Sequence, residues 1–515
     1  MVSQTVVLAA AAAALGLLIG GLIGHFGTPT ISQEDKEKIR TMERLVADKW
    51  VTEEYLNKRI IDLVDPGKLR DNLKELTSKP HLAGTPRDVE LAKMIRERFL
   101  KAGFDTSDLV PYDILLSRPN SSNPNLITLV DGSGGVVFTS NYKEKPLRDG
   151  DDDPDFVHAF NGYAPAGSVS SEAGRGVVYV NYGRVEDFGK LEELGVNVSG
   201  CIAIARYGKI FRGNKLLHAQ ERGAKGMILF SDPGDVAQEG VADDDVYPYT
   251  WWLPGTGMQR GTTYMGSGDP LTPGWSSAAN AYRLTMEDAD LPKIPCQPIG
   301  YHDARVILEK MGGMAAPDEA WKGGLDGLAY NLGPELLDEY SGYTLHLDTH
   351  NTFQQYTSYN VIGTIKGEVE PDRYVLIGNH RDAWGFGASD PSSGTAQILE
   401  TARVMGQLMA DGWRPRRTLV FCSWGAEEYG MIGSTEWVEE HVEKLQERSV
   451  MYLNTDVCAS GPILHVPGSP LLWDAITDIT KMVPGVRQGP TVYDELKDYY
   501  TAMNKTSIDK WYHWW

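Results

Sequence analysis

Cysteine is scarce in this chain of 515 residues, and the four that occur are Cys201, Cys296, Cys422 and Cys458. They form neither a CxxC pair nor a zinc-finger spacing, so the fold is not expected to depend on a disulfide framework. Cys422 lies inside an apolar run, which predicts a buried free thiol.

Basic residues are fewer than acidic residues. The chain has 49 Lys and Arg against 70 Asp and Glu, which gives a formal net charge of -21. This balance argues against a nucleic acid partner, because the phosphate backbone is bound through basic side chains. Hydrophobic residues make up 42% and charged residues 23% of the chain. We therefore expect a packed globular body, and the length allows two to four domains.

Lys and Arg are absent before Lys36, whereas residues 6–24 form an uncharged apolar run. A run of this length can cross a bilayer as a helix, although the lack of flanking basic residues leaves its orientation open. A cleaved signal peptide is the alternative interpretation, and both send the rest of the chain into the secretory route. Three Asn-x-Ser/Thr acceptor sites agree with that route, at Asn120, Asn197 and Asn504.

Three apolar runs in the second half of the chain each lead into residues of metal-binding type. The runs are 374–377, 418–423 and 450–454. They are followed respectively by His380 and Asp382, by Glu427 and Glu428, and by Asp456, while Asp390 lies in the loop 387–394. Helical patterns starting near Ser392 and at Ser434 separate the runs. This alternation predicts a parallel sheet whose strands are buried on both faces and whose carboxyl ends carry the ligands.

The middle of the chain differs in composition. A strand-like piece at 107–116 precedes a segment from about 117 to 352 that is rich in Gly, Pro, Asp and Tyr and has short β-like runs, and a second strand-like piece at 125–130 lies near its start. This pattern predicts an inserted α+β domain, after which the interrupted sheet resumes at 361–365. Acidic clusters at 149–155 and 243–245 lack the spacing of an EF-hand, so solvated loops are favoured over calcium loops.

The polar residues after the three runs match the needs of a two-zinc hydrolase. Two zinc ions lower the pKa of a shared water and hold the attacked carbonyl, and they need carboxylate or imidazole ligands and a separate general base. His380, Asp390, Glu428 and Asp456 are the candidate ligands. Glu427 is the candidate base, since nearby like charge raises the pKa of a carboxylate. Asp382 is positioned to accept a proton from the imidazole and orient it.

Longer blocks of sequence carry a resemblance. They are Asn379–Trp384, Asp390–Gly394, Gly412–Arg417, Ala426–Gly430, Gly433–Trp437 and Glu370–Tyr374. They resemble the glutamate carboxypeptidase II-like family of di-zinc exopeptidases, including its intestinal dipeptidase-like relatives. The resemblance implies an α/β zinc exopeptidase domain with a central mixed, largely parallel sheet flanked by helices and an inserted protease-associated (apical) domain.

That resemblance also implies a division of the chain. It gives a cytoplasmic tail (1–5), a transmembrane signal-anchor (6–24), a stalk (25–58), a first peptidase part (59–116), the apical domain (117–352) and a second peptidase part (353–515). The protein would be a single-pass type II membrane protein with an extracellular ectodomain, and family members are homodimers.

The family's motifs imply a role for each matched residue. His380 and Asp456 would bind one zinc and Glu428 the other, Asp390 would bridge both, and Glu427 would be the proton shuttle. Arg212 would grip the terminal carboxylate of the substrate, a task that suits the guanidinium fork. A calcium site would comprise Thr272 and Trp275, through backbone oxygens, with Glu436 and Glu439.

The chain departs from the family pattern in places. An Asn of the glutamate-selective member is not matched in 260–264, and its Arg is replaced by His465, which leaves the preferred substrate residue open. The family's remaining zinc-binding His and its helical dimerisation domain lie beyond the matched zone. The chain is therefore expected to be C-terminally truncated, and the setting of His513 does not favour it as a substitute ligand.

These observations predict a membrane-anchored zinc metallopeptidase that hydrolyses C-terminal residues from small peptides by zinc-bridged hydroxide attack. Dipeptide hydrolysis or N-terminal trimming is a close variant. The alternative is a non-catalytic receptor or interaction module, as in the transferrin-receptor-like branch, or an inactive truncated form.

Overall fold

The computed structural model describes residues 36, 53–459, 461, 463–487 and 489–502. The chain divides into two compact units, one of residues 64–466 and one of residues 1–63 with 467–515. The predicted tail and anchor and most of the predicted stalk lie outside the described residues. Within the described part, no helix is long and apolar enough to cross a membrane.

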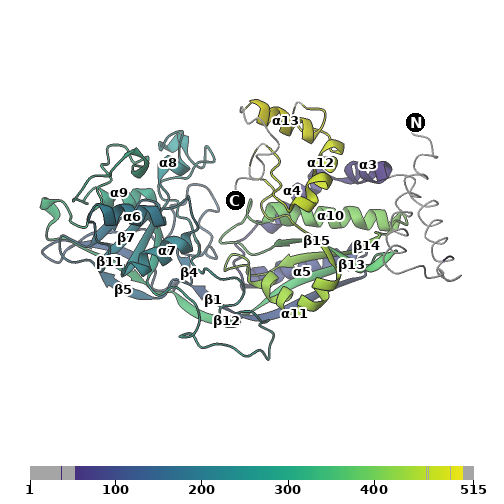
Figure 1. Cartoon of the computed structure of the whole chain (residues 1–515), viewed down its shortest axis with the longest axis horizontal. Coiled ribbons are helices and arrows are strands. Elements are labelled where there is room, and N and C mark those ends of the chain that lie inside the picture. Colours follow the sequence, from purple (N-terminus) through teal and green to yellow (C-terminus); the bar gives the residue numbers. More distant parts are fainter. Residues whose placement is uncertain (1–35, 37–52, 460, 462, 488, 503–515) are drawn as a thin grey trace, which may run out of the picture. The chain divides into compact units, whose positions relative to one another are not determined.

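The larger unit is built on a five-stranded sheet of order β1-β12-β14-β13-β15 (Figure 1). Its strands are β1 (Thr106–Arg118), β12 (Thr352–Ile365), β13 (Glu370–His380), β14 (Arg417–Trp424) and β15 (Ser449–Asn454). β13 pairs in parallel with β14 and β15, whereas β12 pairs antiparallel with β1 and β14. The sheet is mixed, as expected, but its parallel part is limited to the three strands that lead into the candidate ligands.

Helices cover both faces of this sheet. They are α4 (Pro66–Leu76), α5 (Pro86–Lys101) and α10 (Ser392–Ala410) on one face and α11 (Ile432–Arg448) on the other (Figure 1). The start of α5 is fixed by Pro86 in its first turn and by Thr85, whose side chain accepts from the backbone N–H of Asp88. Phe99 of α5 stacks on Phe104 and meets Phe421 of β14 edge-on, which ties this helix to the sheet.

The prediction that all three apolar runs are buried on both faces is wrong for β15. Val450 is 49% exposed, Tyr452 44% and Leu453 41%. The reason is position, since β15 lies at the edge of the sheet and its ladder in the described part is with β13. An apolar run predicts a strand but not its place in the sheet. Cys422 on β14 is fully buried and free, as predicted.

The inserted domain lies between β1 and β12, which form one long antiparallel ladder from Thr106–Thr364 to Arg118–Thr352. It holds a parallel sheet of order β10-β8-β7-β6, an antiparallel sheet of order β3-β2-β11-β5 and the pair β4-β9. The parallel strands are β6 (Val177–Tyr179), β7 (Ile202–Arg206), β8 (Gly226–Phe230) and β10 (Cys296–Ile299). The remaining strands are β2 (Leu126–Val130), β3 (Val136–Thr139), β4 (Asn161–Gly162), β5 (Gly167–Ser170), β9 (Gly261–Thr262) and β11 (Thr344–Thr349).

Helices complete this domain. They are α6 (Val185–Glu193), α7 (Arg212–Glu221), α8 (Pro233–Val236) and α9 (Tyr301–Leu308). Every residue of β7, β8 and β10 is buried, as expected of short apolar runs in a parallel sheet. The predicted α+β character is thus observed.

The smaller unit contains α3 (Glu53–Leu63), α12 (Trp473–Met482) and α13 (Val492–Ala502). The side-chain amide of Asn57 donates to the sulfur of Met482 at 3.1 Å, which links its two sequence segments. Asn504 and His513 lie outside the described residues.

Candidate metal centre

His380, the last residue of the central parallel strand β13, lies between two carboxylates. Its Nε2 is 3.0 Å from Oδ1 of Asp456 and 3.1 Å from Oδ1 of Asp390. Among the described residues, these three place one ligand atom each within 4.8 Å of one another. Ligands of a tetrahedral zinc at about 2.0–2.1 Å stand about 3.3 Å apart, so this spacing fits a shared cation.

The register of the parallel strands explains why these residues meet. His380 pairs with Trp424 at the end of β14, and Gly378 pairs with Asn454 at the end of β15. The loops that leave the three strands therefore start at the same edge of the sheet, where ligand sites of such sheets form. Asp390 joins them from the loop that connects β13 to α10.

The imidazole of His380 is held by the backbone of Asp382. His380 Nδ1 donates to the main-chain oxygen of Asp382 at 2.9 Å, whereas the nearer carboxylate oxygen, Oδ1, is 3.8 Å away. We expected the carboxylate to take this role. A proton on Nδ1 leaves the lone pair of Nε2 directed at the acids, as a metal ligand requires.

The carboxylate of Asp382 instead fixes the turn that carries the Glu pair. It accepts from the backbone N–H of Glu427 at 2.9 Å and of Glu428 at 3.3 Å. Ala426, just before the pair, has a positive φ of 55°, so the chain bends sharply after β14. Asp382 is fully buried, and although burial would raise its pKa, the hydrogen bond and charge of His380 keep that pKa below the usual value.

Negative charge accumulates around the single imidazole. Burial, and then Asp382, Asp456 and Asp390, raise the pKa of Glu427 to about 7, and its Oε2 lies 3.8 Å from His380 Nε2. Burial and then Asp390 raise the pKa of Glu428 well above the usual value, although this residue is not part of the tight cluster. Burial would lower the pKa of His380, yet the surrounding acids raise it well above 6.5. The site is thus short of positive charge, and the donor set fits zinc.

Three residues to which the sequence analysis gave no role support the centre. Arg381 and Asp88 form an ion pair of 2.8 Å in which both side chains are 1% exposed. The side chain of Asn379 donates to the main-chain oxygen of Pro391 and to Thr395, which fixes the loop after Asp390. Asp88 could not be found from local sequence, because it lies 293 residues before Arg381.

Comparison with known proteins agrees with this geometry. Residues 360–469 match the model of peptidase family M28, and residues 175–264 match that of the PA domain. The chain is 39% identical over 507 residues to the mouse protein "Aminopeptidase NAALADL1", covering 96% of this chain and 66% of that protein. The chain belongs to peptidase family M28.

The chain is also similar to two further relatives. A Caenorhabditis briggsae "Glutamate carboxypeptidase 2 homolog" is 40% identical, with 85% of this chain and 58% of that protein covered. The Arabidopsis thaliana "Probable glutamate carboxypeptidase LAMP1" is 42% identical, with 79% and 56% covered. The chain thus spans about 56–66% of the length of these relatives.

Arg212, to which the family resemblance assigns the terminal carboxylate of the substrate, begins α7. Its guanidinium carbon lies 5.3 Å from the ring centroid of Phe211 and 6.0 Å from that of Tyr207. Its Nε is buried without a hydrogen-bond partner, and no ion pair of this side chain occurs in the described part. Gly261 lies beside the guanidinium with a φ of 153°, and a Cβ there would come within 2.3 Å of it, so a larger residue would be strained and would displace Arg212. Arg212 thus packs against aromatic rings without a counter-ion in the described part of the chain, and its Nη1 donates to the main-chain oxygen of Thr262 at 3.5 Å.

Acidic side chains also gather near the start of α11. Glu436 is fully buried and accepts from the backbone N–H of Asp269 at 2.6 Å and of Ser277 at 2.5 Å. Burial and then Glu436 raise the pKa of Glu439 to about 7, and Glu439 Oε2 is buried without a partner. Thr272 lies in the turn after Asp269 and its carbonyl accepts from the N–H of Trp275. Sequence reasoning missed Asp269, whose carboxylate accepts from the backbone N–H of Leu115 and from the hydroxyl of Thr272.

The two acceptor sites for N-glycans within the described residues lie in turns. Asn197 is exposed and its side-chain oxygen accepts from the N–H of Ser199, while Asn120 is partly exposed and accepts from Ser122. Both positions are compatible with a surface modification.

Proposed function

We propose that this protein is a zinc-dependent exopeptidase that removes the C-terminal residue from small peptides. The observation that supports it most is the pair of carboxylates, Asp390 and Asp456, about 3 Å from the imidazole nitrogen of His380, with Glu427 close by. A base with a pKa of about 7 suits proton transfer at neutral pH.

Each residue of the centre has a separate task in this proposal. His380 and Asp456 would hold one zinc ion, Glu428 would hold a second and Asp390 would serve both. When bound, the two ions supply Lewis-acid chemistry that activates water and polarises the scissile carbonyl. Glu427 accepts the proton of the attacking water and transfers it to the leaving amine.

The choice of peptide end rests on Arg212. An unpaired guanidinium can hold the terminal carboxylate of a peptide by a bidentate pair, which favours carboxypeptidase activity. Aminopeptidase activity is the second candidate, because the mouse relative carries that name.

Peptides blocked at one end separate the two candidates. The full chain should cleave an N-acetylated dipeptide and leave a dipeptide amide intact if it acts as a carboxypeptidase, whereas an aminopeptidase shows the reverse. Elemental analysis of the same sample should give about two zinc ions per chain. A protein that binds no zinc and cleaves neither peptide would instead fit the non-catalytic receptor hypothesis.

We further propose a calcium ion at Glu436, Glu439, Thr272 and Trp275, with Asp269 nearby. It would stabilise the junction of α11 with the inserted domain, because oxygen ligands there come from both.

The cellular setting is a proposal of its own. We propose a single-pass type II protein anchored by residues 6–24, with glycans at Asn120, Asn197 and Asn504, an extracellular ectodomain and a homodimeric state. Membrane fractionation and glycosidase treatment of the expressed chain test its location. Light scattering tests the oligomeric state.

A further inference from the structure

A second candidate site lies in the inserted domain. A cavity of about 430 Å³ opens at the carboxyl edge of its parallel sheet, lined by residues that follow β6, β7 and β8 and by the segment 320–323. Ligands of parallel sheets bind at this edge. None of the lining residues belongs to the metal centre, to the calcium cluster or to Arg212.

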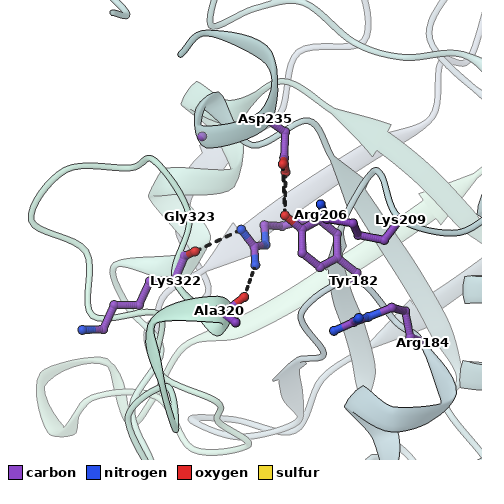
Figure 2. Close-up of a pocket in the computed structure, with 9 residues that line it drawn as sticks. Tyr182, Arg184, Arg206, Lys209, Asp235, Ala320, Lys322 and Gly323 are labelled. Carbon is purple, nitrogen blue, oxygen red and sulfur yellow. Dashed lines mark hydrogen bonds between the residues drawn. The ribbon is translucent and has the colours of Figure 1, made fainter. Parts of the chain in front are cut away.

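Cationic side chains surround one aromatic ring in this cavity. The guanidinium carbon of Arg206 lies 4.1 Å from the ring centroid of Tyr182, and that of Arg184 lies 5.8 Å from it. The ammonium groups of Lys209 and Lys215 lie 5.6 Å from the same centroid. Figure 2 shows Arg206 beside this ring, with Arg184 in the segment after β6 and Lys209 in the segment after β7. Such a concentration of positive charge attracts an anion.

Arg206 is the buried arginine of the group around Tyr182. Its side chain is buried, with 3% exposed, but it has no carboxylate partner among the described residues. Its donors go to the main-chain oxygens of Lys322 (3.1 Å) and Ala320 (2.8 Å) and to the side-chain oxygen of Asn181. Its Nε has no partner. A buried cation without a counter-ion is costly, so an anion in the cavity would stabilise this arrangement.

The nearby acids are already bound to other groups. Asp235 accepts from the hydroxyl of Tyr182 at 2.9 Å, and buried Asp232 accepts from Tyr330 and from two backbone N–H groups. Arg184 is paired with Asp187 and Glu186, and Lys322 with Glu319. Lys209 is exposed and forms no ion pair in the described part of the chain. Arg206 and Lys209 therefore remain as the cations available to a ligand.

We propose that this cavity binds a small oxyanion, a carboxylate or a phosphate, between Arg206 and Lys209 over the ring of Tyr182. The guanidinium of Arg206 provides directional donors and Lys209 provides a point charge at the mouth. The ligand is distinct from the peptide that the metal centre would hold.

The test compares the full chain with two charge-reversed variants. Lys209→Glu alters the cavity, and Lys293→Glu, at an exposed lysine of the same domain, is the matched control. Thermal unfolding is followed against increasing inorganic phosphate or succinate, with sodium chloride at equal ionic strength as the reference. Anion binding at the metal centre is the same in both variants and cancels in the comparison.

We expect phosphate, succinate or both to raise the unfolding temperature of the wild type and of Lys293→Glu. The apparent Kd for the anion, derived from this rise, should be at least tenfold higher in Lys209→Glu. A response to one anion alone identifies the source of the ligand. Equal responses in the two variants, or no response of the wild type beyond that to chloride, would overturn the proposal. Arg206→Lys, which keeps the charge but loses the fork, should weaken binding without abolishing it.

Discussion

Arg381 and Asp88 form a buried ion pair directly behind the metal centre. Arg381 Nε lies 2.8 Å from Asp88 Oδ1, and the same side chain donates to Ser423 and to the main-chain oxygen of Tyr359. Arg381 follows His380 in sequence, while Asp88 lies in the first turn of α5. The pair therefore connects the end of the central strand to the helix layer, which fixes the position of the imidazole.

Asp88→Ala should destabilise the larger unit by about 3–5 kcal/mol, because it leaves the Arg381 cation buried without a partner. Urea unfolding followed by tryptophan fluorescence measures the loss. Glu335→Ala breaks the half-exposed Arg175–Glu335 pair at 3.9 Å and is the control, with an expected cost below about 1 kcal/mol. Equal effects of the two variants would show that the buried pair does not anchor the strand end.

Glu427→Gln should lower kcat by about 10²- to 10⁴-fold while zinc stays bound, because it removes the proton-accepting carboxylate and leaves the ligands in place. Peptide hydrolysis and elemental analysis of the same sample measure the two quantities. Glu443→Gln on the exposed side of α11 is the control and should retain full activity. Unchanged turnover in Glu427→Gln would exclude it as the base.

His380→Ala should lose zinc and activity together, since His380 stands between Asp390 and Asp456. Chelation of the wild type should abolish hydrolysis, and added zinc should restore it. His465→Ala, at an exposed histidine, serves as the control and should keep its metal. Retention of two zinc ions in His380→Ala would contradict the ligand assignment.

Glu439→Gln should abolish a calcium-dependent rise in the unfolding temperature, because Glu439 offers the buried carboxylate oxygen that lacks a partner. Thermal unfolding with calcium or with a calcium chelator measures the effect. Glu443→Gln on the same helix again provides the control. An unaltered response to calcium in Glu439→Gln would place the ion elsewhere.

Lys215 should make stability depend on pH. Burial lowers its pKa to about 7, and its Nζ donates to the main-chain oxygens of Tyr182 and Gly208. Since an unfolded lysine has a pKa near 10.4, the unfolded chain binds one more proton than the folded chain between about pH 7 and pH 10. The free energy of unfolding of the wild type should therefore rise with pH in this window, relative to Lys215→Met, by up to about 1.4 kcal/mol per pH unit.

Urea unfolding at pH 6, 7, 8 and 9 in phosphate-free buffer checks this slope. Below pH 7 the difference between wild type and Lys215→Met should be flat, because Lys215 is then protonated in both states. Lys293→Met removes an exposed lysine and should show no such slope. A pH-independent difference for Lys215→Met would mean that the lysine titrates normally.

Local sequence was sufficient for the elements that carry the metal centre. The apolar runs before His380, Glu427 and Asp456 became β13, β14 and β15, and the helical spacing after Ser392 became α10. These predictions succeed because helical periodicity and the length of an apolar run indicate the type of secondary structure locally. The same information could not show that β15 is an exposed edge strand, since strand order depends on pairing between distant segments.

Sequence by itself determined which residue types stand at the strand ends and that an α+β segment interrupts the sheet. Only the tertiary structure decided that Asp382 holds His380 through its main-chain oxygen, that Asp88 neutralises Arg381, and that Arg206 is buried without a carboxylate partner. Each of these facts depends on distances between side chains from remote positions. Packing of the folded chain sets such distances, and the order of residues along the chain does not show which remote side chains will meet.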